Sequence, residues 1–205
     1  NDGTESDPFN TIGRALTLVK PYLGLAGETV TTINLASGTY SPTTTGEKFP
    51  IVVPDNVHLI GAHMQWTRID AEADEENQAA VMIIKEVENV RVANLTLTGG
   101  FSENHGCKGG GGLLITANDD WNFAGPTAST DVEIENVIIR NNTSFKGGGL
   151  SLIRVSGFDL NNIIIEQNNT TINHPTYENE GGGLFASNSI GSMTNVSITT
   201  NDAHH

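Results

Sequence analysis

Hydrophobic residues in the second half of the chain recur in a pattern that repeats itself. Three runs of glycine each end in a leucine, at Leu113, Leu150 and Leu184, and these leucines are 37 and 34 residues apart. A self-similar period of roughly 20–50 residues is typical of a solenoid, in which each unit buries its apolar face against its neighbour. The pattern therefore predicts a stack of repeating coils.

Each unit also contains an asparagine set among aliphatic residues. It has an aliphatic residue two positions before it and others one and three positions after it, and these asparagines are Asn94, Asn136, Asn162 and Asn195. Six positions downstream stand Gly100, Asn142, Asn168 and Asn201. In stacked coils such asparagines would form two ladders, because their amides bond along the stack and asparagine tolerates the left-handed backbone of sharp bends. We interpret both ladders as structural, against a ligand-binding alternative.

The period inside each unit predicts strands. Residues 131–136 alternate polar and apolar side chains, and residues 137–139 and 163–165 are short β-branched runs. We expect three short strands in each unit: a glycine-run strand, an asparagine-centred strand and a β-branched strand. Stacked units would give parallel sheets with strands about 4.8 Å apart. The predicted fold is an all-β, right-handed parallel β-helix with three sheets.

The first half of the chain fits the same scheme. Residues 56–61 align with residues 89–94 at a distance of 33, and residues 30–40 alternate as a strand does. Residues 10–20 form the only convincing helix, with Asn10 or Thr11 as its cap and Pro21 as its stop. One face of this helix carries Ile12, Ala15, Leu16 and Val19. We expect it to cover the open apolar end of the stack.

Length and charge narrow the function. The 205 residues suit one domain, with coils over about 29–205. Lys and Arg number 10 against 24 Asp and Glu, and the formal net charge of −14 argues against nucleic acid and anionic membranes as partners. The same charge is compatible with calcium. No apolar run approaches the roughly 20 residues of a membrane span, and the lone Cys107 has no partner for an internal disulfide.

The opening of the chain resembles the start of secreted bacterial right-handed β-helix proteins. The matching segments are Asp2-Gly3-Thr4, Asp7-Pro8-Phe9-Asn10-Thr11-Ile12, Arg14-Ala15-Leu16 and Ala36-Ser37-Gly38-Thr39-Tyr40. The continuation through residues 46–51 and 57–61 resembles a domain of unknown function found at that start. The later repeats are similar to polymorphic outer-membrane-protein repeats and related surface-anchored repeats. These resemblances imply the pectate-lyase-like β-helix fold and an extracellular or cell-surface location, and the chain would be part of a longer protein.

Enzymes that resemble this opening include polysaccharide lyases, which need a base beside a uronic carboxylate and a calcium ion or cation to neutralise it. Their groove runs along the sheet that corresponds to the glycine runs. We expect only uncharged side chains to point outward there: Leu114, Thr116, Ser151, Ile153, Phe185 and Ser187. The base candidates are Lys108, Lys146 and Arg140. Such a floor disfavours catalysis.

The outer face of the asparagine strands carries more charge. Asp131, Glu133 and Glu135 would point the same way on one strand, and Asp159 would stack on Glu133. These four carboxylates are either a solvated charged face, with Arg91 stacked on Glu133, or a calcium site. Arg140 should stack near Glu166 as a surface ion pair. An acidic run (Asp70, Glu72, Asp74, Glu75 and Glu76) is interpreted as a solvated loop.

Three loops are longer than the coils require. Residues 117–130 and 170–180 carry aromatic side chains beside carboxylates, a chemistry suited to stacking on sugars and binding their hydroxyls. The glycan-binding candidates are Trp121, Phe123, Asp119, Asp120, Tyr177 and His174. The alternative is that Trp121 and Phe123 fold back over the sheet. The third loop holds His105 and Cys107, which lack two further ligands at zinc spacing.

The sequence predicts an extracellular β-solenoid scaffold that binds glycans or a neighbouring surface protein and is non-catalytic. Two alternatives stay open: a calcium-assisted polysaccharide lyase, and a structural filament or stalk segment. The final coil ends near residues 197–201 without a helix like that of residues 10–20. Because exposed parallel strand edges favour pairing, we expect this end to be covered, by further coils, a cap or self-association.

Overall fold

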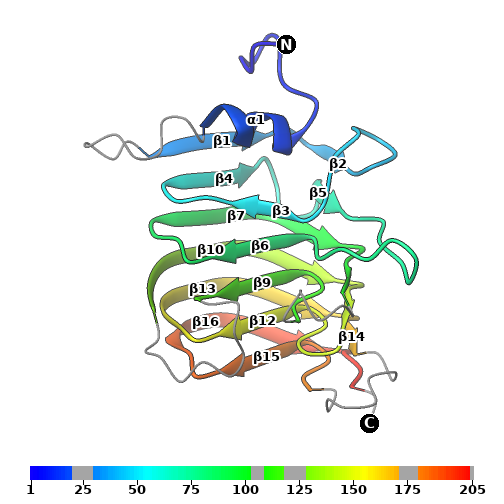
Figure 1. The fold of residues 1–205 in the computed structure, drawn as a ribbon, viewed down its shortest axis with the longest axis vertical. Coiled ribbons are helices and arrows are strands. Elements are labelled where there is room, and N and C mark those ends of the chain that lie inside the picture. The colour runs from blue at the N-terminus through cyan, green and yellow to red at the C-terminus, as the bar shows by residue number, and fades with distance from the viewer. Residues whose placement is uncertain (20–29, 103–108, 118–127, 171–179, 204–205) are drawn as a thin grey trace.

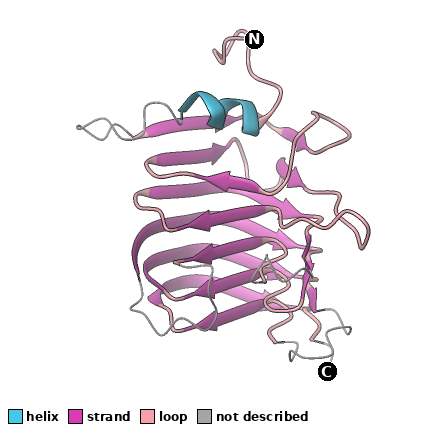
Figure 2. Cartoon of the chain, viewed as in Figure 1, coloured by secondary structure: helices cyan, strands magenta, loops and turns pink. Residues whose placement is uncertain are grey.

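A computed structural model describes residues 1–19, 30–102, 109–117, 128–170 and 180–203, with the side chains of 128–130 outside the description. The strands lie in layers stacked along one axis, with the N-terminal helix at one end (Figures 1 and 2). All strand pairs between named strands are parallel. The fold is the predicted right-handed parallel β-helix.

Within the described residues the strands form three sheets. The eight-stranded sheet contains β1 (Thr31–Leu35), β2 (Gly38–Tyr40), β4 (Val57–Gly61), β5 (Thr67–Asp70), β7 (Val90–Thr98), β10 (Ala128–Arg140), β13 (Val155–Glu166) and β16 (Ile190–Thr199). The five-stranded sheet contains β3 (Ile51–Val53), β6 (Met82–Lys85), β9 (Leu113–Thr116), β12 (Leu150–Ile153) and β15 (Leu184–Ser187). The three-stranded sheet contains β8 (Phe101–Ser102), β11 (Thr143–Ser144) and β14 (Asn169–Thr170).

The division of each coil into strands differs from the prediction. The asparagine-centred and β-branched segments form one strand, because pairing resumes directly after the asparagine: Glu135 pairs with Ala93, and Val137 with Leu95. A single residue in the left-handed conformation bends the strand without using enough residues to interrupt its ladder. The third sheet consists instead of two-residue strands, of which β11 follows Asn142, β14 follows Asn168 and β8 follows Gly100.

The repeats stack in the predicted register. Leu150 pairs with Leu113 on one side and with Leu184 on the other. The expected alignment of residues 56–61 with residues 89–94 is also confirmed, since Leu59 pairs with Val92. Equivalent residues of successive coils therefore lie next to each other, which is the arrangement that ladders of identical side chains require.

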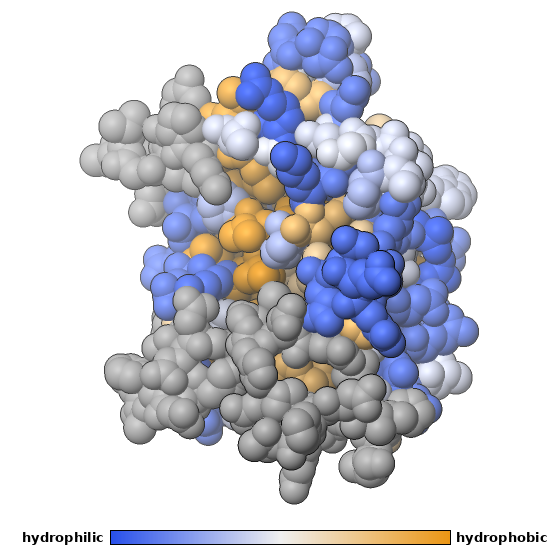
Figure 3. Space-filling model, turned by 45° about the vertical axis from the view of Figure 1, so that its right-hand side comes forward, coloured by the Kyte–Doolittle hydropathy of each residue, from blue (hydrophilic) through white to orange (hydrophobic). Residues whose placement is uncertain are grey.

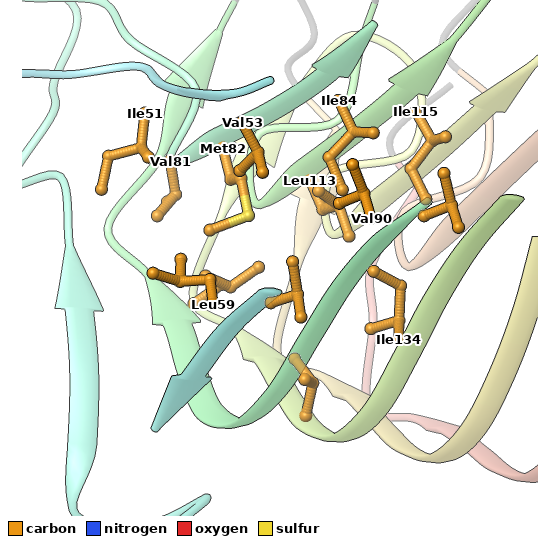
Figure 4. Packing of buried hydrophobic residues seen from close by; sticks show 14 of the residues in the cluster. Ile51, Val53, Leu59, Val81, Met82, Ile84, Val90, Leu113, Ile115 and Ile134 are labelled. Atoms are coloured by element: carbon orange, nitrogen blue, oxygen red, sulfur yellow. The ribbon is translucent and has the colours of Figure 1, made fainter. Parts of the chain in front are cut away.

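The core lies between the sheets and is filled by every second residue of each strand. Side chains of the five-stranded sheet face those of the eight-stranded sheet across the interior, with Leu113 and Ile115 on one side and Leu59 and Ile134 on the other (Figure 4). All four side chains are fully buried. Full burial of an aliphatic side chain stabilises a fold by about 1.5–3 kcal/mol. The stacked core, with neighbours from adjacent coils, is the main source of stability.

The outer asparagines form a ladder at the bend of each long strand. Asn136 donates from its Nδ2 to Oδ1 of Asn94 at 3.0 Å, and Asn162 donates to Asn136 at 2.7 Å. Their backbone φ angles, and that of Asn195, lie between 53° and 59°, the left-handed region that asparagine tolerates better than most residues. A further pair upstream, Asn89 and Asn56, bonds in the same way at 2.8 Å.

The inner asparagines form a second, buried ladder. Asn142 and Asn168 are each only 1% exposed. Oδ1 of Asn168 accepts the backbone N–H of Asn142 at 3.1 Å and its Nδ2 at 3.0 Å. Asn201 serves Asn168 in the same way, with both distances at 3.0 Å. Because buried polar groups are costly when unpaired, each amide supports the coil next to it.

The glycine runs are shaped by this inner ladder. A Cβ atom placed on Gly149 would lie 2.7 Å from Nδ2 of Asn168, and one on Gly183 would lie 2.6 Å from Nδ2 of Asn201. Gly112 stands in the same relation to Asn142, at 2.7 Å. Only glycine leaves room for the amide at these positions. The two repeated motifs of the sequence are therefore two halves of one packing arrangement.

The predicted helix is present as α1 (Ile12–Val19) and covers the β1 end of the stack (Figure 1). Its buried side chains Ile12, Leu16 and Val19 join the core. Thr11 caps the helix, since its Oγ1 accepts the Arg14 N–H at 3.2 Å. The described part of the chain contains no helix that is long and apolar enough to cross a membrane.

A second cap of α1 comes from a distant residue. Glu47 is 3% exposed, and its carboxylate accepts the N–H groups of Ile12 at 2.5 Å and Gly13 at 3.1 Å. A negative charge at a helix N-terminus satisfies N–H groups that have no partner within the helix and interacts favourably with the helix dipole. Glu47 therefore fastens the helix to the first coils.

Candidate binding surface

A row of polar and charged side chains crosses the outer face of the eight-stranded sheet. His58 on β4 pairs with Arg91 on β7, which pairs with Glu133 on β10. Glu133 pairs with Asp159 on β13, which pairs with Ser192 on β16. We call these five residues the charged row. The expected succession of Arg91, Glu133 and Asp159 is present within it.

Arg91 is the centre of the charge in this row. Its Nε lies 3.4 Å from Oε1 of Glu133, and its Nη2 contacts Oε2 of Glu135 on the same strand as Glu133. The pKa of Arg91 is raised, first by the hydrogen bond to Glu135 and also by the charge of Glu133. Ser192 donates to Asp159 at 2.6 Å. The positive charge of Arg91 is thus compensated by the carboxylates of Glu133 and Glu135.

The structure does not gather the proposed calcium ligands Asp131, Glu133, Glu135 and Asp159 into a metal site. Within the described ranges, no group of three or more His, Cys, Asp or Glu side chains is placed to hold a metal ion. The physical reason is that the guanidinium of Arg91 binds both Glu133 and Glu135. A cation would have to compete with this fixed positive charge.

Two of the base candidates are held in ion pairs. Arg140 pairs with Glu166 in register, as expected, with a separation of 4.0 Å. Lys146 lies 2.7 Å from Oε2 of Glu180, and its Nζ lies 4.9 Å from the centre of the Phe185 ring. The remaining candidate, Lys108, falls outside the described residues.

The outward side chains of the five-stranded sheet are uncharged, as expected, and several of them are buried. Leu114, Thr116, Ser151 and Ile153 do not join the core cluster, yet each is at most 3% exposed. Phe185 and Ser187 are half-buried. These side chains point outward, as predicted. Their burial was not predicted, because the alternation along a strand gives the direction of a side chain but not what covers it. Hydrophobic residues are visible in the middle of the molecular surface in the view of Figure 3.

The acidic run is ordered by its own hydrogen bonds. Glu72 accepts the N–H of Thr43 at 3.1 Å and its hydroxyl at 2.6 Å. These hydrogen bonds, above all the one from the Thr43 side chain, lower the pKa of Glu72. Asp74 accepts the N–H groups of Glu76 and Asn77. This fits the expected solvated loop.

The same loop borders an open cleft of about 750 Å³. Phe49 and Ala71 supply its apolar wall, and Glu75 and Gln78 are among its polar residues. Glu75 is exposed to solvent. The cleft thus combines one aromatic wall with acidic and amide groups.

The sequence-predicted glycan ligands lie outside the described residues. This holds for Trp121, Phe123, Asp119, Asp120, Tyr177 and His174, and also for His105 and Cys107. Their role in binding therefore stays a prediction.

Sequence reasoning missed an aromatic pair on the turn between β4 and β5. The rings of His63 and Trp66 are stacked, with centroids 4.3 Å apart and an interplanar angle of 25°. The signal that could have revealed it is an insertion: Gly61 precedes five extra residues, whereas the equivalent Asn94 continues directly into Leu95. Insertions in a solenoid form loops on one face, often the binding face.

The sequence model of the family described as Protein of unknown function (DUF1565) matches residues 1–204. The chain belongs to this family. No curated protein matches the chain.

Two pectin methylesterase structures are similar in backbone course. One, in complex with hexasaccharide VII, is 11% identical with a TM-score of 0.46, and the alignment covers 94% of this chain and 65% of the enzyme. The other, PemA from Erwinia chrysanthemi, is 15% identical with a TM-score of 0.41, covering 92% of this chain and 64% of the enzyme. The chain thus spans less than two thirds of the length of these enzymes. Fold similarity at this level does not carry an activity across.

Proposed function

We propose that this DUF1565 chain is a β-solenoid scaffold that binds glycans or a neighbouring protein, outside the cell or on its surface, without catalysing a reaction. The observation that carries the proposal is the pairing of acids with bases on its outer faces. Arg91 is bound by Glu133 and Glu135, Arg140 by Glu166, and Lys146 by Glu180.

This pairing disfavours acid–base catalysis. A general base must be free to take a proton from the substrate and have a pKa near the working pH. The nitrogens of Lys146 and Arg140 lie against carboxylates of this chain and are not placed to take a proton from a substrate. The outward side chains of β9 and β12 supply neither an acid nor a base, since they are Leu114, Thr116, Ser151 and Ile153.

The same geometry favours binding. Strands in register hold the charged row at a regular repeat of about 4.8 Å along the stack. A rigid surface loses little conformational entropy when a partner binds. Extended solenoid faces of this kind suit extended partners such as polysaccharide chains. The acidic composition, with a net charge of −14, and the resemblance of the opening to secreted β-helix proteins support an extracellular location.

The test combines a binding screen with an activity assay. The 205-residue chain is applied to an array of neutral, amino and uronic polysaccharides, and hits are measured by titration calorimetry. In parallel, uronic polymers are incubated with the chain, with and without calcium, and unsaturated product is followed by its absorbance. We expect saturable binding and no product. Turnover of a uronic polymer would establish the lyase alternative and overturn the proposal.

The loop candidates are tested in the same screen. If the loop of residues 117–130 binds the glycan, Trp121→Ala should abolish binding while the thermal unfolding midpoint stays unchanged, because stacking area is lost and no coil is disturbed. Unchanged binding by this variant would place the site elsewhere on the molecule.

A further inference from the structure

The turn Ala62–Trp66 is an insertion at the corner where the later coils bend at an asparagine and the first coil passes through Ala36 and Ser37. Gly61 takes the place of Asn94 in the register, and Thr67 takes the place of Leu95. Between these positions β7 has no residue and the β4–β5 coil has five. The insertion therefore projects from the sheet corner without altering the coils on either side. We call it the Trp66 turn.

The backbone of the Trp66 turn is held at both ends. Ala62 donates to the carbonyl of Leu35 at 2.9 Å, and the carbonyl of Trp66 accepts the N–H of Gly38 at 2.7 Å. Within the turn, the carbonyl of His63 accepts the N–H groups of Trp66 at 3.1 Å and Thr67 at 2.9 Å. Leu35 and Gly38 of the first coil thus hold the first and the last residue of the turn.

The middle of the turn is fixed as well. Thr96 on the next coil is 1% exposed, and its hydroxyl donates to the carbonyl of Met64 at 2.6 Å. The N–H of Gln65 donates to Nδ1 of His63 at 3.2 Å, which orients the imidazole ring. The turn is consequently rigid before any ligand arrives.

This rigid turn presents an aromatic surface to solvent. Trp66 is 64% exposed. Among the exposed large hydrophobic residues of the described part of the chain, it is the only aromatic one. His63 covers one face of the indole at 4.3 Å. An indole that is held in place with one face open to solvent offers a flat apolar surface on which a ligand ring can stack.

The surroundings of Trp66 favour a saccharide over a protein partner. Protein hot spots lie at the centre of apolar patches. The other exposed large hydrophobics of the described chain lie on other elements: Leu18, Val30, Val52, Ile190, Met193 and Ile198. The neighbours of Trp66 along the turn and into β5 are instead the polar Gln65 and Arg68. A single ring bordered by hydrogen-bonding groups matches a sugar, which has an apolar C–H face and a polar rim.

We propose that the Trp66 turn is a saccharide-binding site, in which the free face of the indole stacks on the C–H face of one sugar ring of a neutral polysaccharide. This rests on the proposed function as a glycan-binding scaffold and names its site and ligand class. Neutral chains are preferred because the net charge of −14 repels uronic polymers. His63 acts as a positioning residue that holds the indole in place.

The experiment compares four proteins by calorimetry on the neutral polysaccharide that binds best: the unaltered chain, Trp66→Ala, Trp66→Phe and Val52→Ala. Val52 is a matched control, since it is also an exposed hydrophobic residue but lies on β3 of the five-stranded sheet. We expect Trp66→Ala to weaken binding at least about tenfold and Trp66→Phe to retain part of it, because a smaller ring still stacks. Val52→Ala should bind as the unaltered chain does.

A spectroscopic readout locates the sugar independently. The chain has two tryptophans, so Trp121→Phe leaves Trp66 as its only indole fluorophore. Saturating polysaccharide should shift the emission of this variant to shorter wavelength. His63→Ala should weaken binding less than Trp66→Ala does, with no change in the thermal midpoint beyond that of Trp66→Ala.

The outcomes separate the two proposals. If the chain binds polysaccharides and Trp66→Ala binds equally well, the site is wrong and the proposed function stands. If the unaltered chain binds no polysaccharide on the array, the saccharide site is wrong and so is the glycan-binding part of the proposed function. Tighter binding of uronic than of neutral polymers would overturn the ligand class. If Trp66→Ala changes only self-association, measured by sedimentation, the turn is a protein contact and the saccharide site is overturned.

Discussion

At the scale of single residues, asparagine has two distinct roles in this protein. Asn136 sits at the surface bend, where its left-handed backbone and its amide both contribute. Asn168 is buried beside the glycine runs, where its amide replaces missing backbone partners. The same residue type is used twice because its side chain both donates and accepts. Asn136 therefore contributes through its backbone conformation and its hydrogen bonds, whereas Asn168 contributes through its hydrogen bonds.

Replacing Asn136 should reveal both effects. Asn136→Ala loses the hydrogen bonds to Asn94 and from Asn162 and places a Cβ-bearing residue without a polar side chain at a φ of 53°. We expect a loss of about 1–3 kcal/mol in the free energy of unfolding, measured by urea denaturation. Asn136→Gly serves as the control, because glycine tolerates the backbone but cannot make the ladder. An unchanged midpoint for Asn136→Ala would refute a structural ladder.

At the scale of elements, each glycine run and the inner asparagine next to it form one packing unit. The strand β12 begins after Gly149, whose missing side chain makes room for the Asn168 amide. Asn168 in turn accepts the N–H of Asn142 and bonds the carbonyl of Ile139 at 2.9 Å. This explains why the two motifs recur together along the chain.

A methyl group at Gly149 should therefore disturb two coils. Gly149→Ala would place its Cβ 2.7 Å from both Nδ2 of Asn168 and the carbonyl oxygen of Gly183. Overpacking of this kind costs about 1–3 kcal/mol, which urea denaturation can measure. Gly46→Ala measures backbone strain without a clash, because Gly46 has a φ of +76° and no atom within 4 Å of the added Cβ, whereas Gly149 lies outside the left-handed region. A Gly149→Ala variant as stable as the unaltered chain would contradict the packing unit.

At the scale of the whole molecule, the two ends of the stack differ. Helix α1 and Glu47 close the β1 end. At the opposite end β16 exposes Ile190 by 72%, Met193 by 42% and Ile198 by 46%. Among the described residues the uncovered end is that of β16, so association through it would join two copies of the 205-residue chain end to end.

The chain of 205 residues should consequently dimerise at high concentration. We expect sedimentation equilibrium to show a monomer–dimer transition without larger species, and Met193→Glu to shift it toward monomer by placing charge in the contact. Val52→Glu, a charge on an exposed residue of another sheet, should leave the transition unchanged. A monomer at all concentrations would contradict self-association through β16, and continued growth beyond dimers would support a filament.

The β-helix architecture and the register in which its coils stack can be predicted from the amino-acid sequence alone. Repeats such as those ending at Leu113 and Leu150, and the face of α1 that carries Ile12 and Leu16, are local patterns with a fixed period. A stack of like units leaves one register in which all apolar faces are buried. The ladders and the ion pair of Arg140 with Glu166 follow from that register alone.

The contacts that side chains make with other coils become known only from the folded structure. Arg91 binds Glu135 as well as the Glu133 opposite it, because long side chains also reach diagonal neighbours. Leu114 points outward and is nevertheless buried. The stack of Trp66 on His63 depends on how a five-residue insertion folds against Thr96 and Met64. Periodicity gives the direction of a side chain along its own strand, but only the folded chain determines what meets it there.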